Sequence, residues 1–359
     1  MFLDKVLSIL KENDSSIAYT VKDEQYTYNE LYKFISNIYS FLIKKNINKK
    51  PVIIYGHKDV YMKASFLACS FAGMAYVPID SNMPKCRVID IIDQINPNII
   101  IGDIDIENSK IISSKKINKI MNNKNFEDID TVMLKPKDIY YIIFTSGSTG
   151  TPKGVKVTYS NLNSCLNWLE EITKIHKGVV LNQASFSFDL SVADLYLSLI
   201  TKSEQFVLEK DVQSNFKILF KYLKDSKANI LVATPSFVDL LLLDKSFNNE
   251  LMPYLKTILF CGEKLMPKTV EKIYSKFQNI KIINCYGPTE CTFAVTSIEL
   301  SRNKVYKDEI PIGKPKKDVK IFIVDEDMKV QEDNKVGEIL ISGMSVANGY
   351  VKKYQIMVS

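Results

Sequence analysis

The sequence is poor in arginine and histidine. Arginine occurs only at Arg87 and Arg302 in 359 residues. Bidentate guanidinium clamps on phosphate or carboxylate are therefore almost unavailable, and an anion site must use backbone N–H groups, hydroxyls and lysine. The two histidines, His57 and His176, exclude a metal site built from several imidazoles. We expect each of them to be an ordinary surface or packed residue.

Strong charge of one sign and long apolar runs are also missing. The 47 Lys and Arg against 41 Asp and Glu leave a net charge of +6, without a basic tail or stripe, so no nucleic-acid partner is expected. No window reaches the ~18 apolar residues of a membrane span, and the N-terminus lacks a signal-type apolar stretch. The six cysteines form no Cys-x-x-Cys pair and are expected to be reduced thiols. We expect a soluble, cytoplasmic protein with no membrane insertion.

What is present is a regular alternation of apolar runs and helical patterns. Residues 1–46 predict two amphipathic helices that flank a strand region at 18–28. Apolar runs that predict buried strands lie at residues 51–55, 76–79, 98–101, 140–144, 178–181, 205–208, 230–233, 257–260 and 281–284. Continuous apolar strands separated by helices are typical of parallel α/β sheets. Residues 107–137 indicate an irregular connection, and short strands from 305 onward indicate a small antiparallel barrel.

A segment rich in hydroxyls and glycine follows the strand expected at 140–144. Its polar and small residues are Thr145, Ser146, Gly147, Ser148, Thr149, Gly150 and Lys153. Glycines permit positive-φ turns that direct several backbone N–H groups at one anion, so the segment predicts a phosphate-binding loop. It is neither Walker A nor G-x-G-x-x-G, because Pro152 and Thr149 stand where those motifs need glycine. The alternative is a flexible Ser/Gly linker.

An acidic residue, Asp189, stands between the aromatic Phe188 and an apolar helical pattern. An Asp before a helix usually caps it, so a structural cap is one open interpretation. The other is a carboxylate at the mouth of an apolar pocket that pairs with a substrate ammonium group.

Residues 284–292 combine an aromatic ring, a Gly-Pro turn, a hydroxyl and a carboxylate directly after an expected strand. A plain turn needs only Gly287 and Pro288. In the functional interpretation the ring of Tyr286 stacks on a base. Glu290 then takes a hard cation such as Mg²⁺, which prefers oxygen ligands and bridges to nucleotide phosphates.

Together the three segments resemble the signature of the adenylate-forming superfamily, with further matches at 27–31, 72–80, 337–343 and 349–350. The resemblance implies an AMP-binding N-terminal adenylation domain over residues 1–350. Its fold class is α/β, with two doubly wound α/β subdomains plus a small β-barrel at about 305–350. Asp189 and the sequences at 186–192, 233–238 and 260–263 resemble most the ligases that load D-alanine onto a carrier protein for teichoic acid modification. In those ligases a cysteine stands at the position of Cys261.

The resemblance also implies roles for single residues. Those implied to bind ATP are Thr145, Ser146, Gly147, Ser148, Thr149, Gly150, Lys153, Asn284, Cys285, Tyr286, Gly287, Pro288 and Thr289. Lys153, Thr289 and Glu290 are implied to be catalytic, with Glu290 holding Mg²⁺. Asp189, Cys261 and Phe293 are implied to line the amino-acid pocket. Phe293 replaces a small aliphatic residue of those ligases, which shrinks the pocket or forces it to repack.

The implied chemistry has two half-reactions. The substrate carboxylate attacks the α-phosphorus of ATP to give aminoacyl-AMP and pyrophosphate. A phosphopantetheine thiol on a carrier protein then attacks the activated carbonyl. Alignment and charge neutralisation supply most of the catalysis of the first step, so no histidine is needed.

The family continues past the position of Tyr350 with a ribose-binding Asp and a small C-terminal domain that carries a catalytic Lys. Residues 351–359 match neither, so we interpret them as a truncated tail and the C-terminal domain as absent. Activity is then expected to be residual, or to require the missing half from a second chain. The alternatives are a peptide-synthetase adenylation domain for another amino acid, and a non-catalytic nucleotide-binding fragment.

Overall fold

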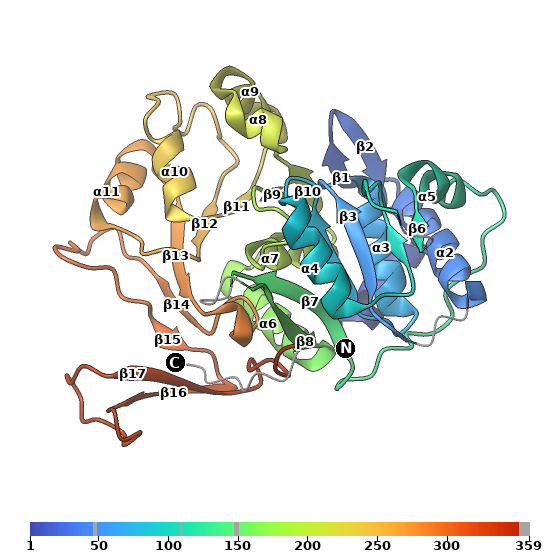
Figure 1. Ribbon diagram of the computed structural model, residues 1–359. Coiled ribbons are helices and arrows are strands. Elements are labelled where there is room, and N and C mark those ends of the chain that lie inside the picture. The colour runs from blue at the N-terminus through green and yellow to red at the C-terminus, as the bar shows by residue number, and fades with distance from the viewer. Residues whose placement is uncertain (46–48, 108–109, 147–150, 352–359) are drawn as a thin grey trace.

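The computed structural model describes residues 1–45, 49–107, 110–146 and 151–351. Two β-sheets lie side by side, with helices α6 (Tyr159–Thr173) and α7 (Leu190–Ile200) in the centre of the molecule (Figure 1). Every residue of α7 is buried. Most of its residues are apolar, and such a helix is stable only when it is covered on all sides, which is why this segment lies at the centre.

The smaller sheet has the strand order β6-β5-β3-β4-β7-β8, and its pairs are parallel except for β7–β8. Its strands are β3 (Val52–Gly56), β4 (Tyr76–Asp80), β5 (Ile100–Ile101), β6 (Ile111–Ile112), β7 (Ile139–Thr145) and β8 (Lys153–Thr158). The helices of this part of the chain are α2 (Tyr28–Lys45), α3 (Val60–Phe71), α4 (Lys85–Ile95) and α5 (Ser114–Met121).

The larger sheet has the order β15-β14-β13-β12-β11-β9-β10-β1-β2, with a parallel centre and antiparallel edges. Its strands are β1 (Ile17–Val21), β2 (Glu24–Thr27), β9 (Val179–Asn182), β10 (Glu204–Val207), β11 (Ile230–Ala233), β12 (Thr257–Phe260), β13 (Lys281–Tyr286), β14 (Thr296–Glu299) and β15 (Lys314–Pro315). The remaining helices are α1 (Phe2–Lys11), α8 (Lys210–Ser214), α9 (Phe216–Ser226), α10 (Pro235–Leu241), α11 (Pro267–Lys276) and the 3₁₀ turn η1 (Thr289–Cys291).

The nine apolar runs all form strands, and the two expected N-terminal helices are α1 and α2. β11 and β12 are buried along their whole length, as continuous apolar runs predict for a sheet covered on both faces. Thr234 caps α10 through its hydroxyl, and Pro235 fills the first helical position, where a missing N–H costs nothing.

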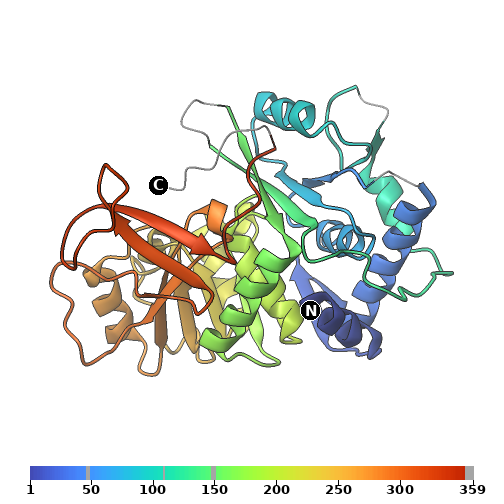
Figure 2. The same ribbon diagram turned by 90° about the horizontal axis from the view of Figure 1, so that it is seen from below.

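Two regions differ from the expected description. Residues 107–137 are not wholly irregular, because they contain β6 and α5. Only Ile117 and Met121 of α5 are buried, so the apolar signal of this short lysine-rich helix is too weak to detect. In the C-terminal region, β16 (Val319–Val324) and β17 (Glu338–Gly343) pair as an antiparallel two-stranded sheet, so the described residues do not close a barrel (Figure 2). Within the described ranges, no helix has the length and apolarity needed to cross a membrane.

Candidate functional site

The sequence-predicted residues lie at the carboxyl ends of parallel strands from both sheets. Thr145 ends β7 and Tyr286 ends β13, while Cys261 directly follows β12. The segment after β9 leads to Asp189 at the start of α7. Loops at these ends of α/β strands form the usual binding crevice of such folds.

The predicted phosphate loop connects two paired strands. Thr145 is half-buried, Ser146 is exposed, and Thr145 lies opposite Lys153 in the β7–β8 pair. Gly147, Ser148, Thr149 and Gly150 lie outside the described residues. The two ends of the loop are thus paired in one hairpin, whereas a linker joins two separate units. The Lys153 Nζ lies 5.7 Å from the ring centroid of Tyr350, within cation–π range.

Asp189 occupies the N-cap position of α7, but its side chain makes no capping hydrogen bond. It is 6% exposed. Burial raises the pKa of Asp189 from 3.8 to about 6; the neighbouring Glu290 carboxylate raises it too, while a hydrogen bond with Thr289 opposes both. A buried carboxylate that is not engaged as a cap is suited to bind a cation. The structural-cap interpretation is therefore the weaker one.

Thr289 and Glu290 lie on η1, directly after the Gly-Pro turn. Glu290 Oε1 accepts a hydrogen bond of 2.7 Å from the Tyr350 hydroxyl, and its backbone carbonyl accepts one of 2.8 Å from the N–H of Ala347. Mg²⁺ is commonly held by one or two carboxylates together with substrate phosphates and waters. The Glu290 carboxylate is oriented by a hydrogen bond at one of its oxygens, Oε1, and a single carboxylate of this kind fits such a site. The described residues contain no cluster of three or more His, Cys, Asp or Glu suited to a metal, so the phosphates would supply the other ligands.

Cys261 and Phe293 meet at the apolar side of the site. The Cys261 thiol lies 3.7 Å from the carbonyl oxygen of Phe293, and both side chains are buried. Burial raises the pKa of Cys261, so the thiol is protonated. Thr292 and Phe293 both have left-handed φ angles, of 58° and 73°. Consecutive non-glycine residues in this region are strained and are common at functional sites. A hydrogen bond of 2.9 Å from the Thr292 hydroxyl to the Ser345 carbonyl helps to hold them.

The side chains of the segment expected to bind adenosine point alternately to the two faces of the sheet along β13. The Cys285 side chain lies in the hydrophobic core, so it is not available to a ligand. Asn284 donates from its side-chain nitrogen to the Pro311 carbonyl across 3.0 Å. Tyr286 is half-buried, as a ring that stacks on a base on one face would be. A Cβ on Gly287 would lie 2.5 Å from the Cα of Ala294, so this turn requires glycine.

Sequence reasoning missed several residues at this edge of the sheets. Tyr350 was only part of a matching motif, yet it contacts Glu290 and lies near Lys153. His57 was expected to be ordinary, but its ring contacts Asp80, which also binds Ser185. Ser185 and Asp80 are 105 positions apart, and no local pattern links such distant residues.

The chain is similar to known proteins along nearly its whole length. The family model described as AMP-binding enzyme matches residues 10–351. A D-alanine–D-alanyl carrier protein ligase of Bacillus licheniformis is 34% identical over 355 residues, which are 97% of this chain and 71% of the relative. A ligase of the same name from Listeria monocytogenes is 38% identical over 339 residues, 91% of this chain and 66% of the relative.

Solved structures share the fold at lower identity. A four-domain nonribosomal peptide synthetase bound to AMP and glycine superposes with a TM-score of 0.85 at 24% identity, over 98% of this chain and 26% of that one. The N-terminal subdomain of Klebsiella oxytoca NpsA, in complex with 3-hydroxybenzoyl-AMSN, gives 0.84 at 20% identity, over 97% and 88% of the two chains.

Proposed function

Because the chain belongs to the family of AMP-binding enzymes, we propose that it activates a small amino acid with ATP and Mg²⁺. D-alanine is the proposed substrate, and the phosphopantetheine thiol of a carrier protein is the proposed acceptor. The observation that carries the proposal is Asp189, a buried carboxylate without a capping role beside Thr289. The names of the similar ligases support D-alanine and the carrier protein.

In the proposed complex the Asp189 carboxylate pairs with the substrate ammonium, and the wall formed by Cys261 and Phe293 limits the side chain. This pairing directs the substrate carboxylate toward the nucleotide. One carboxylate oxygen attacks the α-phosphorus of ATP while the bond to pyrophosphate breaks. Catalysis is then mainly the alignment of the two reactants.

The remaining predicted residues would hold the nucleotide. Thr145 and Ser146 lie at the start of the hairpin connection whose hydroxyls and N–H groups would bind the phosphates. Thr289 would donate to the α-phosphate, and Lys153 would neutralise developing negative charge. Tyr286 would stack on the adenine. When bound at Glu290, Mg²⁺ would neutralise phosphate charge.

The second half-reaction transfers the aminoacyl group. The carrier thiol attacks the carbonyl carbon and loses its proton, a thioester forms, and AMP leaves. A carrier protein that lacks phosphopantetheine has no thiol and is the matched negative control for this step.

The test is amino-acid-dependent pyrophosphate release from ATP and Mg²⁺, with D-alanine, L-alanine and glycine in parallel. We expect release with D-alanine that is lost in Asp189→Asn, since removing one partner of a buried charge pair costs about 2–5 kcal/mol. Asp225→Asn, at an exposed surface pair with Lys221, should leave the rate unchanged. Release that prefers another amino acid would favour the peptide-synthetase alternative. ATP binding without release would favour a nucleotide-binding fragment, and a full ligase rate would contradict the expected residual activity.

A further inference from the structure

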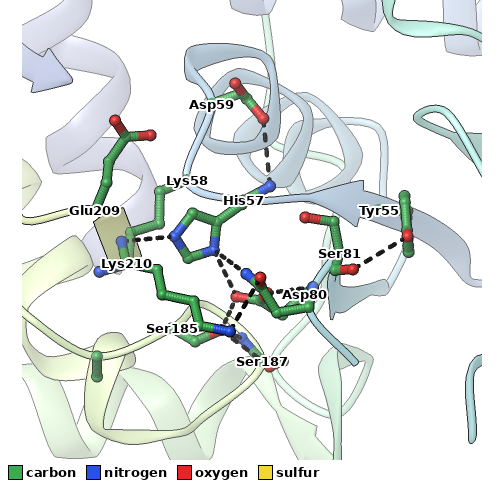
Figure 3. Close-up of polar contacts among 12 residues, drawn as sticks. Tyr55, His57, Lys58, Asp59, Asp80, Ser81, Ser185, Ser187, Glu209 and Lys210 are labelled. Atoms are coloured by element: carbon green, nitrogen blue, oxygen red, sulfur yellow. Dashed lines mark hydrogen bonds and ion pairs between the residues drawn. The ribbon is translucent and has the colours of Figure 1, made fainter. Parts of the chain in front are cut away.

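The carboxylate of Asp80 collects four hydrogen bonds at the junction of the two sheets (Figure 3). Asp80 is the last residue of β4 and is buried. Its Oδ2 accepts from His57 Nδ1 at 2.9 Å and from the Ser185 hydroxyl at 2.5 Å. Its Oδ1 accepts from the backbone and the side-chain nitrogen of Asn82, each at 2.8 Å. Burial opposes ionisation, but these donors together lower the pKa of Asp80.

The side-chain nitrogen of Asn82 also lies 3.2 Å from His57 Nδ1, but the contact at the other ring nitrogen decides the tautomer. The backbone N–H of Lys210 donates to His57 Nε2 across 3.2 Å, so Nε2 is unprotonated and the ring proton lies on Nδ1, directed at Asp80. Ser185 has one hydroxyl proton, which goes to Asp80. The Ser187 hydroxyl, 3.0 Å away, and the Ser187 N–H, at 3.3 Å, therefore donate to Ser185. Within this network His57 Nδ1, the Ser185 hydroxyl and the two Asn82 nitrogens donate to the Asp80 carboxylate, which only accepts.

This order of protons excludes a Ser-His-Asp nucleophile. In such a triad the imidazole accepts the serine proton and the aspartate orients the imidazole. Here Ser185 donates to Asp80 directly, and a backbone N–H occupies His57 Nε2. The imidazole is therefore not placed to take the Ser185 proton.

The network holds the turn that carries Asp189. The Phe188 N–H donates to the Ser185 carbonyl across 3.0 Å, and the Val192 N–H donates to the Asp189 carbonyl across 3.0 Å. Ser185 follows β9 of the larger sheet, whereas Asp80 ends β4 and His57 follows β3 of the smaller sheet. The hydrogen bond between Ser185 and Asp80 therefore fixes the start of the turn against the opposite sheet.

We propose that His57, Asp80 and Ser185 are positioning residues that set the location of the Asp189 carboxylate and thereby the affinity for the amino acid. They act through the Ser185–Asp189 turn and do not touch substrate. The effect on amino-acid binding rests on the proposed function, whereas the effect of these residues on the position of the Ser185–Asp189 turn does not.

The hold on the turn is tested without substrate, by hydrogen exchange of the peptide that covers residues 183–192. Ser185→Ala removes the hydroxyl, and Ser185→Thr restores one. His57→Gln removes the donor at the Nδ1 position, whereas His57→Asn places an amide nitrogen near it. His176→Gln, at the exposed second histidine, is the matched control. We expect exchange about tenfold faster in Ser185→Ala and His57→Gln, and within about threefold of wild type in the other three. Exchange in Ser185→Ala equal to that of His176→Gln would overturn the proposal.

The consequence for binding is tested by kinetics of the same variants. We expect Ser185→Ala to raise the KM for D-alanine about tenfold, with the KM for ATP within about twofold of wild type and recovery in Ser185→Thr. An equal rise in both KM values, without rescue by threonine, would indicate a merely structural role. If wild type releases no pyrophosphate with any amino acid, the proposed function fails, and the exchange experiment still decides the positioning role.

Discussion

The hydroxyl of Tyr350 donates a hydrogen bond of 2.7 Å to Oε1 of Glu290. Tyr350 also forms a bridge with Val155 of β8, and the Val351 N–H donates to the Gly154 carbonyl across 2.9 Å. The segment around Tyr350 therefore ties the β7–β8 hairpin of the smaller sheet to η1, which follows the larger sheet. The two halves of the predicted nucleotide site are held together by this segment.

Removing the Tyr350 hydroxyl should weaken nucleotide binding. Tyr350→Phe keeps the ring near Lys153 but leaves Glu290 without its orienting donor. A hydrogen bond to a charged group contributes about 1.5–3 kcal/mol when shielded, and partial exposure reduces this, so we expect a rise of about fivefold in the Kd of Mg–ATP. Calorimetric titration measures it, and an unchanged Kd would remove Tyr350 from the site.

Asp189→Asn should stabilise the protein while it abolishes amino-acid binding. Burial raises the pKa of Asp189 from 3.8 in the unfolded chain to about 6 in the folded state. Ionisation of Asp189 therefore lowers the free energy of unfolding, by an amount that grows from about pH 4 and is complete above pH 6. Each pKa unit is worth about 1.4 kcal/mol, which sets an upper limit of about 3 kcal/mol for the gain at pH 8. The gain should shrink as the pH falls and be below about 1 kcal/mol at pH 4, where Asp189 is protonated in the folded state and partly protonated in the unfolded state.

Urea unfolding of wild type and Asp189→Asn from pH 4 to pH 8 measures this difference. A difference in unfolding free energy that does not change with pH would show that Asp189 is not the titrating group. Asp225→Asn should show no such trend, because Asp225 lies at an exposed helical ion pair.

Phe293→Leu should enlarge the amino-acid pocket. The Phe293 side chain is buried, its carbonyl oxygen lies 3.7 Å from the Cys261 thiol, and a smaller side chain at residue 293 leaves space in the interior. We expect destabilisation of about 1 kcal/mol or more and a relative gain for D-2-aminobutyrate over D-alanine in pyrophosphate release. Leucine is chosen because a β-branched residue would be strained at the φ of 73°. An unchanged ratio between the two substrates would place Phe293 outside the pocket.

Lys58→Met should destabilise the fold far more than the same substitution at an exposed lysine. Lys58 is buried, and its Nζ donates to the carbonyl oxygens of Gln183 and Leu208, each at 2.8 Å. Burial lowers the pKa of Lys58 to about 8. Methionine fills the volume but removes one of the two side-chain donors from each carbonyl, since the Gln213 side-chain nitrogen also donates to both. We expect a loss of about 1–3 kcal/mol in total.

Lys221→Met is the control for Lys58→Met, since exposed ion pairs contribute about 0–1 kcal/mol. Chemical unfolding of both variants measures the difference. A loss for Lys58→Met no larger than that for Lys221→Met would contradict the structural role of the buried lysine.

The sequence by itself determined the nine apolar strands, the two N-terminal helices and the three segments that carry the predicted chemistry. These follow from local physics: apolar runs such as Thr257–Phe260 must be buried, glycines permit tight turns, and Asp189 precedes an apolar helix. The motif resemblance then led to the family, which the comparisons confirm. The site roles remain proposals.

Only the tertiary structure decided which distant residues meet. The contact of Tyr350 with Glu290 and that of Asp80 with Ser185 join segments from different sheets, while His57 reaches Asp80 from the neighbouring strand of the same sheet. Each of these hydrogen bonds forms only when two distant segments lie next to each other, and no local sequence pattern predicts that. The same reason explains why α5 was missed: its two buried residues gain their contacts from α2 and α3, whereas its own sequence is polar. Local sequence determines which segments form helices and strands, and the packing of the two sheets determines which side chains meet at their shared edge.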